Sequence, residues 1–219
     1  INADYFYDLP HLPGPGETLA ATRMASGLGG KGANQSVAAA LAGIEVRHIG
    51  CVGTDGAWAV DRLREFGVDV RHVRVGETLT AHAIVMVDEA GENQIVIYPG
   101  ANMEQDELSI AAALENAVSG DWLMLQNETS LQMEAAKLAR EKGLSVAYSA
   151  APFDVQAVEA ILPFATLVIM NEVEAQQYAA ETGRSIEELP VSYALVTKGK
   201  DGATWHDLDA SEAAQVTAF

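Results

Sequence analysis

The chain of 219 residues carries 31 acidic against 13 basic side chains, a formal charge of −18 at pH 7. A surface of this sign repels phosphate backbones, so the composition argues against nucleic acid as a partner. Apolar residues make up 49% of the chain, which is enough for one well-buried core. We therefore expect one domain over residues 1–219.

Nothing in the sequence indicates a membrane or an oxidising compartment. Cys51 is the single cysteine, so no intrachain disulfide can form, as is usual in a reducing cytoplasm. No apolar run approaches the roughly 20 residues of a membrane-spanning helix. No signal-peptide pattern opens the chain. We expect a cytoplasmic protein with no membrane partner.

The first hundred residues favour short strands and two helices. Ala33–Ala42 and Gly56–Phe66 predict helices, because each is followed by glycine, the usual helix-stop residue. Glu89–Glu92 is typical of a hairpin turn between two strands. We expect a small β appendage built from strands within about residues 4–26 and 81–98. The expected strands are Asp4–Asp8, Thr18–Ser26, Ala81–Asp88 and Asn93–Tyr98.

From about residue 106, helical and extended segments alternate. Apolar runs such as Leu167–Met170, each followed by a helical segment, are typical of a parallel sheet covered on both faces. The pattern predicts an α/β sandwich. The expected helices are Asp106–Ala117, Leu131–Lys142, Val155–Leu162 and Val173–Glu181. The expected strands are Trp122–Gln126, Ser145–Tyr148, Thr166–Met170 and Ala194–Thr197.

Polar residues follow several of these strands. In open parallel sheets, ligands bind at the carboxyl ends of the strands. Such residues also cap the helix that follows, so each one alone has a structural explanation. Their expected position along one rim favours a binding site. They are Glu128, Ser149, Asn171, Glu172, Lys198 and Gly199, joined by Asn2 and Asp4 if Ile1 ends a strand.

The glycine-rich segment Gly27–Gln35 precedes the alanine-rich helix. Glycines let a backbone approach a ligand closely, and a helix start offers unbonded N–H groups. The segment fits the dinucleotide pattern G-x-G-x-x-G, with Asp55 downstream, so an NAD(P)-dependent oxidoreductase is an alternative. A dinucleotide-binding site requires a buried parallel strand before the glycines, whereas Thr18–Ser26 is interrupted by polar residues. A flexible turn before a packed helix is the structural alternative.

Several motifs together resemble the ribokinase branch of the phosphofructokinase B family of carbohydrate kinases. The resemblance covers the whole chain in order, and its most specific part is the run Gly29–Gln35. It implies a three-layer α/β/α sandwich with a mainly parallel sheet and a small β-strand lid. The other motifs are Asn2–Asp4, Pro15–Glu17, Gly50–Gly56, Gly91–Asn93, Gly100–Asn102, Gln126–Glu128, Asn171–Glu174 and Thr197–Gly202.

The resemblance also implies the roles of individual residues. One group of residues would bind the hydroxyls of a sugar, with carboxylate and amide side chains that supply directional hydrogen bonds. ATP would be bound by residues after the later strands. Glu174 would act through the water shell of Mg²⁺. The implied sugar-binding residues are Asn2, Asp4, Gly30, Lys31, Asn34 and Glu128. The implied nucleotide-binding residues are Asn171, Thr197, Lys198, Gly199 and Gly202.

By the same resemblance, the expected activity is transfer of the γ-phosphate of ATP to a sugar hydroxyl, first of all D-ribose to D-ribose 5-phosphate. Another sugar, a nucleoside or a 2-keto-3-deoxy sugar acid is the alternative substrate, and a non-catalytic sugar-binding domain is an alternative of another class. The expected cofactors are ATP and Mg²⁺. The lids of two subunits would pack together in a homodimer.

Two departures from the family pattern stand out. Ser149–Pro152 occupies the place of a usual Asn-Pro-Ala-Pro run. The segment expected to carry the catalytic base and a monovalent-cation (K⁺) site would follow Phe219. We therefore expect residues 1–219 to be incomplete at both ends, and we assign no catalytic base within them.

Overall fold

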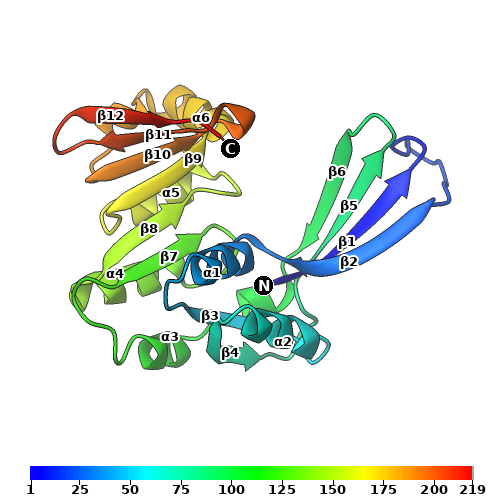
Figure 1. Ribbon diagram of the computed structural model, residues 1–219, viewed down its shortest axis with the longest axis horizontal. Helices are drawn as coiled ribbons and strands as arrows, with labels where there is room; N and C mark the ends of the chain where they lie inside the picture. Colours follow the sequence, from blue (N-terminus) through cyan, green and yellow to red (C-terminus); the bar gives the residue numbers. More distant parts are fainter. Residues whose placement is uncertain (219) are drawn as a thin grey trace. The chain divides into compact units, whose positions relative to one another are not determined.

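The computed structural model describes residues 1–218. Contacts divide them into two compact units, Ile1–Gln105 and a second unit from Asp106 onward (Figure 1). The first unit contains a four-stranded sheet, a two-stranded sheet and two helices. The second contains a six-stranded sheet and four α-helices. Among the described residues, no helix is both long enough and apolar enough to cross a membrane.

The four-stranded sheet of the first unit is the predicted β appendage. Its order is β2-β1-β5-β6, with β1 and β5 parallel and both outer pairs antiparallel. The hairpin predicted around Glu89–Glu92 is confirmed, because β5 and β6 pair across it. We call this sheet the lid sheet. Its strands are β1 (Asn2–Leu9), β2 (Arg23–Gly29), β5 (His82–Asp88) and β6 (Asn93–Tyr98).

The prediction for the second strand was wrong in its bounds. Thr22 donates from both its backbone nitrogen and its hydroxyl to the Asp8 carbonyl, which closes the long loop after β1. The strand therefore begins only at Arg23, and it continues through the first glycines to Gly29. Part of the glycine segment is thus a strand and not a turn.

The rest of the first unit packs two helices against a parallel strand pair. Strands β3 (Arg47–Val52) and β4 (Asp69–Val75) were not predicted, because charged side chains and histidines interrupt their apolar residues. The core between these strands and the helices is buried, and it includes Val52 from the strands and Leu63 from the helices. The remaining elements are α1 (Lys31–Leu41), α2 (Ala57–Glu65) and the short 3₁₀ helix η1 (Gly100–Met103).

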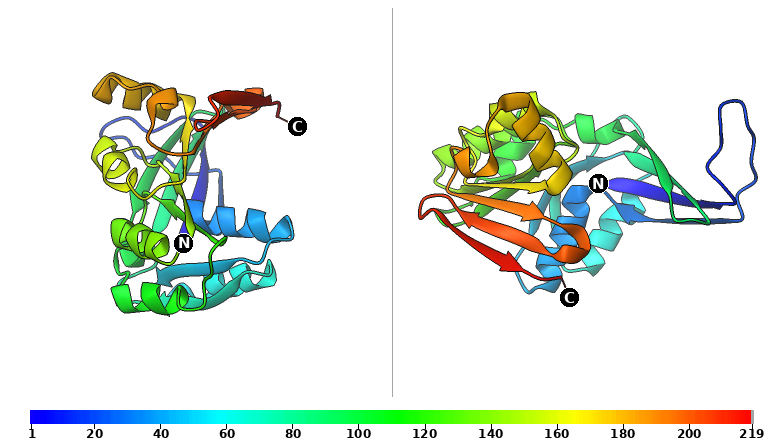
Figure 2. Two further views of the ribbon diagram at one scale, coloured as in Figure 1. Left: turned by 90° about the vertical axis from the view of Figure 1, so that its left-hand side faces the viewer. Right: turned by 90° about the horizontal axis from the view of Figure 1, so that it is seen from above.

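The second unit has the predicted alternation of helices and parallel strands. Neighbours β7, β8, β9 and β10 pair in chain order. Right-handed crossovers then place their connecting helices on one face of the sheet, with α4 on β7 and β8 and α6 on β9 and β10 (Figure 2). The strands are β7 (Trp122–Gln126), β8 (Ser145–Ser149), β9 (Leu167–Asn171) and β10 (Tyr193–Thr197). The helices are α3 (Glu107–Ala113), α4 (Gln132–Glu141), α5 (Val155–Ile161) and α6 (Glu172–Thr182).

The sheet of the second unit ends in an antiparallel ribbon that was not predicted. Strands β11 (Ala203–Asp207) and β12 (Glu212–Val216) follow β10 as two hairpins. Every residue of β12 is exposed, and its sequence EAAQV has little β propensity, so no residue-type signal marked it. Short 3₁₀ helices, η2 (Ile186–Glu188) and η3 (Gly199–Asp201), complete the unit.

Candidate functional site

Asn2 and Asp4 lie at the start of β1, beside the last glycine of β2 and the glycine that follows it. A Cβ atom added to Gly29 would lie 2.0 Å from Oδ2 of Asp4, and one on Gly30 would lie 2.9 Å from the nitrogen of Asn2. These glycines therefore leave the space that the two polar side chains occupy. Both residues lie within β1, which covers Asn2–Leu9.

Lys31 and Asn34 belong to the first turn of α1, directly after the glycines. Gly30 precedes the helix with φ of 90°, and its carbonyl accepts the Asn34 N–H at 3.0 Å. No side chain caps this helix start. The structure thus brings four sugar-binding candidates of the first unit, Asn2, Gly30, Lys31 and Asn34, into one short stretch of β1 and the β2–α1 junction, with Asp4 held against the adjoining Gly29.

The loop before β5 is held by a carboxylate. Asp55 Oδ1 accepts hydrogen bonds from the backbone nitrogen and the hydroxyl of Thr80, at 2.9 and 2.7 Å. The Thr80 hydroxyl in turn accepts the Gly53 N–H at 3.0 Å. The bond from the Thr80 backbone is the largest of the interactions that lower the pKa of Asp55. The motif Gly50–Gly56 therefore has a structural role.

These contacts overturn the dinucleotide-binding alternative. That reading needs a buried parallel strand before the glycines, but β2 is an edge strand that pairs only with β1, in antiparallel fashion. It also needs Asp55 to bind a ribose, whereas this carboxylate accepts two hydrogen bonds from Thr80.

In the second unit, the predicted polar residues gather along one edge of the sheet. Gln126 pairs with Ser149, and Asn171 pairs with Thr197, so the carboxyl ends of all four parallel strands lie at the same edge. With strands spaced about 4.8 Å apart, the ends of β7 and β10 are separated by about 14 Å. Glu128, which follows β7, is thus well removed from Thr197 and belongs to another part of the rim.

The loop that carries Glu128 is fastened to the loop after β8. The backbone nitrogen of Asn127 donates to the Ala151 carbonyl at 3.1 Å, and its side-chain amide donates to the Pro152 carbonyl at 2.8 Å. Gln132 adds a bond to the Thr129 carbonyl at 2.7 Å. Ser149–Pro152, the run that departs from the family pattern, therefore supports the backbone beside Glu128.

Asn171 and Glu174 form a capping box at the start of α6. The Asn171 side chain accepts the Glu174 N–H, and the Glu174 carboxylate accepts the Asn171 N–H, both at 2.8 Å. The capping explanation is therefore correct for Asn171, and both residues remain exposed or half-buried at the sheet edge. Among residues 1–218, no group of three or more His, Cys, Asp or Glu side chains could hold a metal.

Thr197–Gly202 forms the tight connection between β10 and β11. The Lys198 nitrogen donates to the Gly202 carbonyl at 2.7 Å. Gly199 and Gly202 have φ of 54° and 89°, conformations that favour glycine. A Cβ on Gly202 would lie 1.9 Å from the Val216 carbonyl oxygen, so the turn packs directly on β12.

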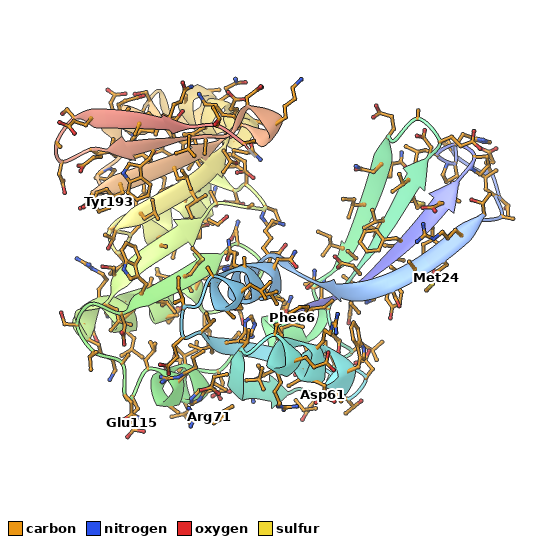
Figure 3. The ribbon with its side chains drawn as sticks, in the orientation of Figure 1. Met24, Asp61, Phe66, Arg71, Glu115 and Tyr193 are labelled. Carbon is orange, nitrogen blue, oxygen red and sulfur yellow. The ribbon has the colours of Figure 1, made fainter. Side chains whose placement is uncertain are left out.

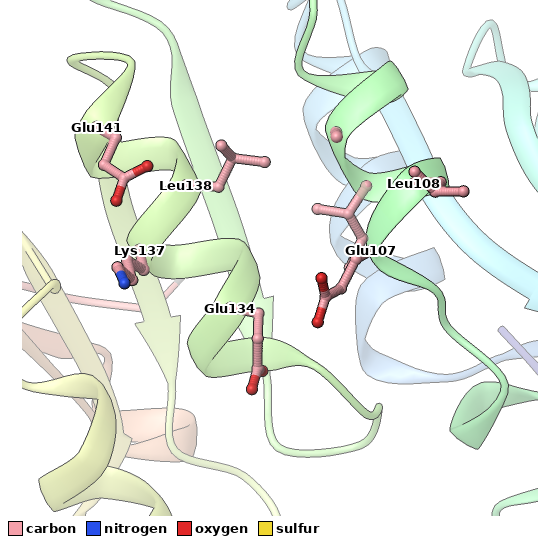
Figure 4. A pocket seen from close by; sticks show the side chains of 8 residues that line it. Glu107, Leu108, Glu134, Lys137, Leu138 and Glu141 are labelled. Carbon is pink, nitrogen blue, oxygen red and sulfur yellow. The ribbon is translucent and has the colours of Figure 1, made fainter.

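A groove of about 470 Å³ between α3 and α4 is a separate feature of the second unit (Figure 4). Its charged lining is three glutamates and one lysine: Glu107, Glu134, Glu141 and Lys137. None of the sequence-predicted site residues lines it. A lining of net negative charge would repel ATP, so we do not place the nucleotide here.

Comparison with known proteins agrees with these features. The pfkB family carbohydrate kinase model matches residues 2–219. A ribokinase of Haemophilus influenzae is 31% identical over 217 residues, which cover 92% of this chain and 71% of that protein. A ribokinase structure from Cryptococcus neoformans in complex with ADP superposes with a TM-score of 0.82 at 27% identity, covering all of this chain and 76% of the other. The Arabidopsis thaliana ribokinase complexed with ribose and ATP gives 0.81 at 25% identity, covering 100% and 75%.

The lid sheet, the parallel sheet with its polar rim and the glycine segment define a carbohydrate kinase of the ribokinase-like α/β fold. The chain belongs to the pfkB family of carbohydrate kinases. The predicted fold class and the family resemblance are both confirmed.

Proposed function

We propose that the protein transfers the γ-phosphate of ATP to a hydroxyl of a neutral pentose, with D-ribose as the first substrate. The observation that carries this proposal is the pair Asn2 and Asp4, seated against Gly29 and Gly30. A carboxylate and an amide at the entry of a lid suit a polyhydroxylated, uncharged ligand. Similarity to proteins named ribokinase supports D-ribose.

The charge near this group favours a sugar over a sugar acid. An acidic substrate would need an arginine close to Asn2 and Asp4. Arg23 is on β2, but it pairs with Asp8 at 3.7 Å and lies six residues before Gly29. That separation is about 20 Å along a strand. We therefore rank a 2-keto-3-deoxy sugar acid below a neutral pentose or a nucleoside.

The second unit would supply the nucleotide site. Thr197–Gly202 offers backbone groups at a glycine-rich turn, and Asn171, on the neighbouring strand, lies beside it. Glu174 accepts the Asn171 N–H through Oε2. Because one oxygen is used in this way, the carboxylate is suited to contact Mg²⁺ through a water molecule and not to surround the ion directly. This fits an ion that keeps several waters and binds through phosphates. Mg²⁺, when bound, would neutralise charge on the transferred phosphoryl group.

The activity is tested with the whole protein, because we assign no catalytic base within residues 1–219. Coupled ADP release is measured with Mg-ATP and D-ribose, 2-deoxy-D-ribose, other pentoses, nucleosides and 2-keto-3-deoxy sugar acids. Calorimetry of sugar binding runs beside it. We expect D-ribose to give the largest response in both measurements. Binding of a sugar without ADP release would favour the non-catalytic alternative, and no response to any member of the panel would contradict the proposal.

Removal of a hydroxyl-binding group should weaken sugar binding. For Asp4→Ala and Asn34→Ala we expect a loss of about 1–3 kcal/mol, or about 5- to 150-fold in dissociation constant, because one polar partner is lost. Asp8→Ala is the matched control, since it removes a carboxylate from the same strand at its distant end. Unchanged affinity for D-ribose in both site variants would refute the assignment.

We also propose that a second copy of the chain covers the lid sheet. Phe6, Val85 and Ile95 are register partners on one face, and Phe6 and Ile95 are 40% and 53% exposed. Met24, labelled in Figure 3, is a further exposed apolar side chain on β2. A four-stranded sheet with such exposed faces gains stability when its apolar residues are covered.

The homodimer is tested by light scattering at micromolar concentration. We expect a dimeric mass for the natural sequence and a monomeric mass for Ile95→Lys, because a charge would then face the covered surface. Glu92→Lys, in the exposed turn between β5 and β6, is the control for added positive charge. A monomeric mass of the unaltered protein would contradict the proposal.

A further inference from the structure

We propose that Asn102 is a positioning residue, which holds the Asn2 carboxamide so that its NH₂ group, and not its oxygen, meets a sugar hydroxyl. The inference rests on the proposed function for the identity of the ligand. The orientation itself follows from three atoms in the first unit. Asn102 belongs to η1 and is 100 residues from Asn2 in the chain.

The orientation of the Asn102 carboxamide is set by a nitrogen, which can only donate a hydrogen bond. The nitrogen of Ile1 donates to Oδ1 of Asn102 at 3.1 Å. Because a carboxamide has oxygen on one side and nitrogen on the other, Nδ2 of Asn102 is turned to the opposite side. There it donates to Oδ1 of Asn2 at 2.9 Å. The oxygen of Asn2 is thereby occupied, and its Nδ2 is the atom left to donate to a hydroxyl.

Burial makes this arrangement specific. Asn2 and Asn102 are 4% and 3% exposed. In such surroundings, turning either carboxamide over would place two oxygens or two NH₂ groups against each other and leave buried groups unsatisfied, which is costly. The Gly30 backbone also approaches Asn2 so closely that an added Cβ would lie 3.3 Å from its Oδ1.

The backbone around both residues is fixed by the same short segment. Ala101 donates to the Leu79 carbonyl at 3.0 Å, and Ala3 donates to the Ala81 carbonyl at 2.8 Å. Thr80, between these two carbonyls, is held by Asp55. Each of η1 and β1 is therefore tied to residues 79–81 at the position next to its asparagine.

Gly100, the first residue of the run Gly100–Asn102, permits a close backbone contact that this arrangement needs. A Cβ on Gly100 would lie 2.4 Å from the Leu79 carbonyl oxygen and 2.9 Å from the Ala81 nitrogen, and its φ is 45°. Only glycine permits this approach. Gly100 brings η1 against the segment, Ala101 is fully buried there, and Asn102 reaches Asn2.

The decisive variant is Asn102→Asp, which keeps an acceptor for the Ile1 nitrogen and removes the donor to Asn2. We expect the Asn2 carboxamide to turn over, since its NH₂ group can then donate to the new carboxylate. The dissociation constant for D-ribose should rise about tenfold, as one hydrogen bond to the ligand is lost. The affinity for Mg-ATP should not change. Asn93→Asp, on exposed β6, is the control for the added charge.

A double-mutant cycle separates positioning from a general structural effect. If Asn102 acts through Asn2, then Asn102→Asp should not weaken D-ribose binding further in an Asn2→Ala background. An equal loss in both backgrounds, or unchanged affinity in the single variant, would overturn the inference.

A measurement without sugar tests the orientation even if a variant folds poorly or D-ribose does not bind. In the unaltered protein, the side-chain NH₂ protons of Asn102 should exchange slowly with solvent by NMR, because Asn2 accepts one of them. That protection should fall in Asn2→Ala. Exchange as fast as that of exposed Asn93 would overturn the inference, whereas protection without binding of any sugar would refute only the proposed function.

Discussion

Replacement of Gly29 by alanine should weaken sugar binding as much as removal of the Asp4 carboxylate. The new Cβ would lie 2.0 to 2.4 Å from the three carboxylate atoms of Asp4, so this side chain must leave its position. Asp4 is too short to reach the same place from another rotamer. We expect a loss of about 1–3 kcal/mol in the free energy of D-ribose binding, measured by calorimetry.

Gly27→Ala provides a matched control for this variant. Gly27 lies in the same strand, is the register partner of Asp4, and has no atom within 4 Å of its added Cβ. Its sugar affinity should stay near that of the unaltered protein. The double variant Gly29→Ala, Asp4→Ala should bind no more weakly than Asp4→Ala alone. If Gly29→Ala keeps full affinity, Asp4 does not act from the position that the structure gives it.

Regular periodicity decided which elements could be predicted from the sequence. The four parallel strands of the second unit were found because apolar runs such as Leu167–Met170 alternate with helical segments. Strand β4 was missed because Arg71, His72 and Arg74 interrupt its apolar residues, although its partner β3 buries it in part. Strand β12 was missed because its residues are all exposed and its pairing with β11 alone makes it a strand.

The candidate site was predictable where a motif points to a residue and not where a residue supports another one from a distant part of the chain. Asn2, Asp4 and Asn34 stood out through their motifs, and the structure places them in one short region. Asn102 was quoted in a motif without any role, because its partner is 100 residues away. Asp55 was considered for a ribose, but its partner Thr80 comes from a loop that no sequence pattern connects to it.

These contacts explain why so many glycines occur in the motifs. Gly29 and Gly30 make room for Asp4 and Asn2, the proposed sugar-binding residues, whereas Gly53 and Gly100 let backbone segments meet. A Cβ on Gly53 would lie 2.3 Å from the Thr78 carbonyl oxygen. Gly29 should therefore control sugar affinity with little effect on folding, because its added Cβ would meet only side-chain atoms, whereas Gly53 and Gly100 should control the stability of the first unit.

Gly202→Ala should have the largest effect on stability in the second unit. The added Cβ would lie 1.9 Å from the Val216 carbonyl oxygen and 2.9 Å from the Ala218 nitrogen, and both are backbone atoms that cannot turn away. The residue also has φ of 89°, which an alanine adopts only with strain. Together we expect a loss of at least about 3 kcal/mol in the free energy of unfolding, measured by urea denaturation.

The same substitution should weaken Mg-ATP binding, since the turn Thr197–Gly202 must separate from β12 to admit the new atom. Gly199→Ala is the matched control, because this glycine has φ of 54° and its added Cβ would meet nothing within 4 Å. The Gly199→Ala variant has the backbone strain but not the collision, so its free energy of unfolding should fall by only about 1 kcal/mol. Equal losses in the two variants would show that strain alone matters. Unchanged stability in Gly202→Ala would mean that β12 does not pack on this turn, and the proposed nucleotide site would then lack that support.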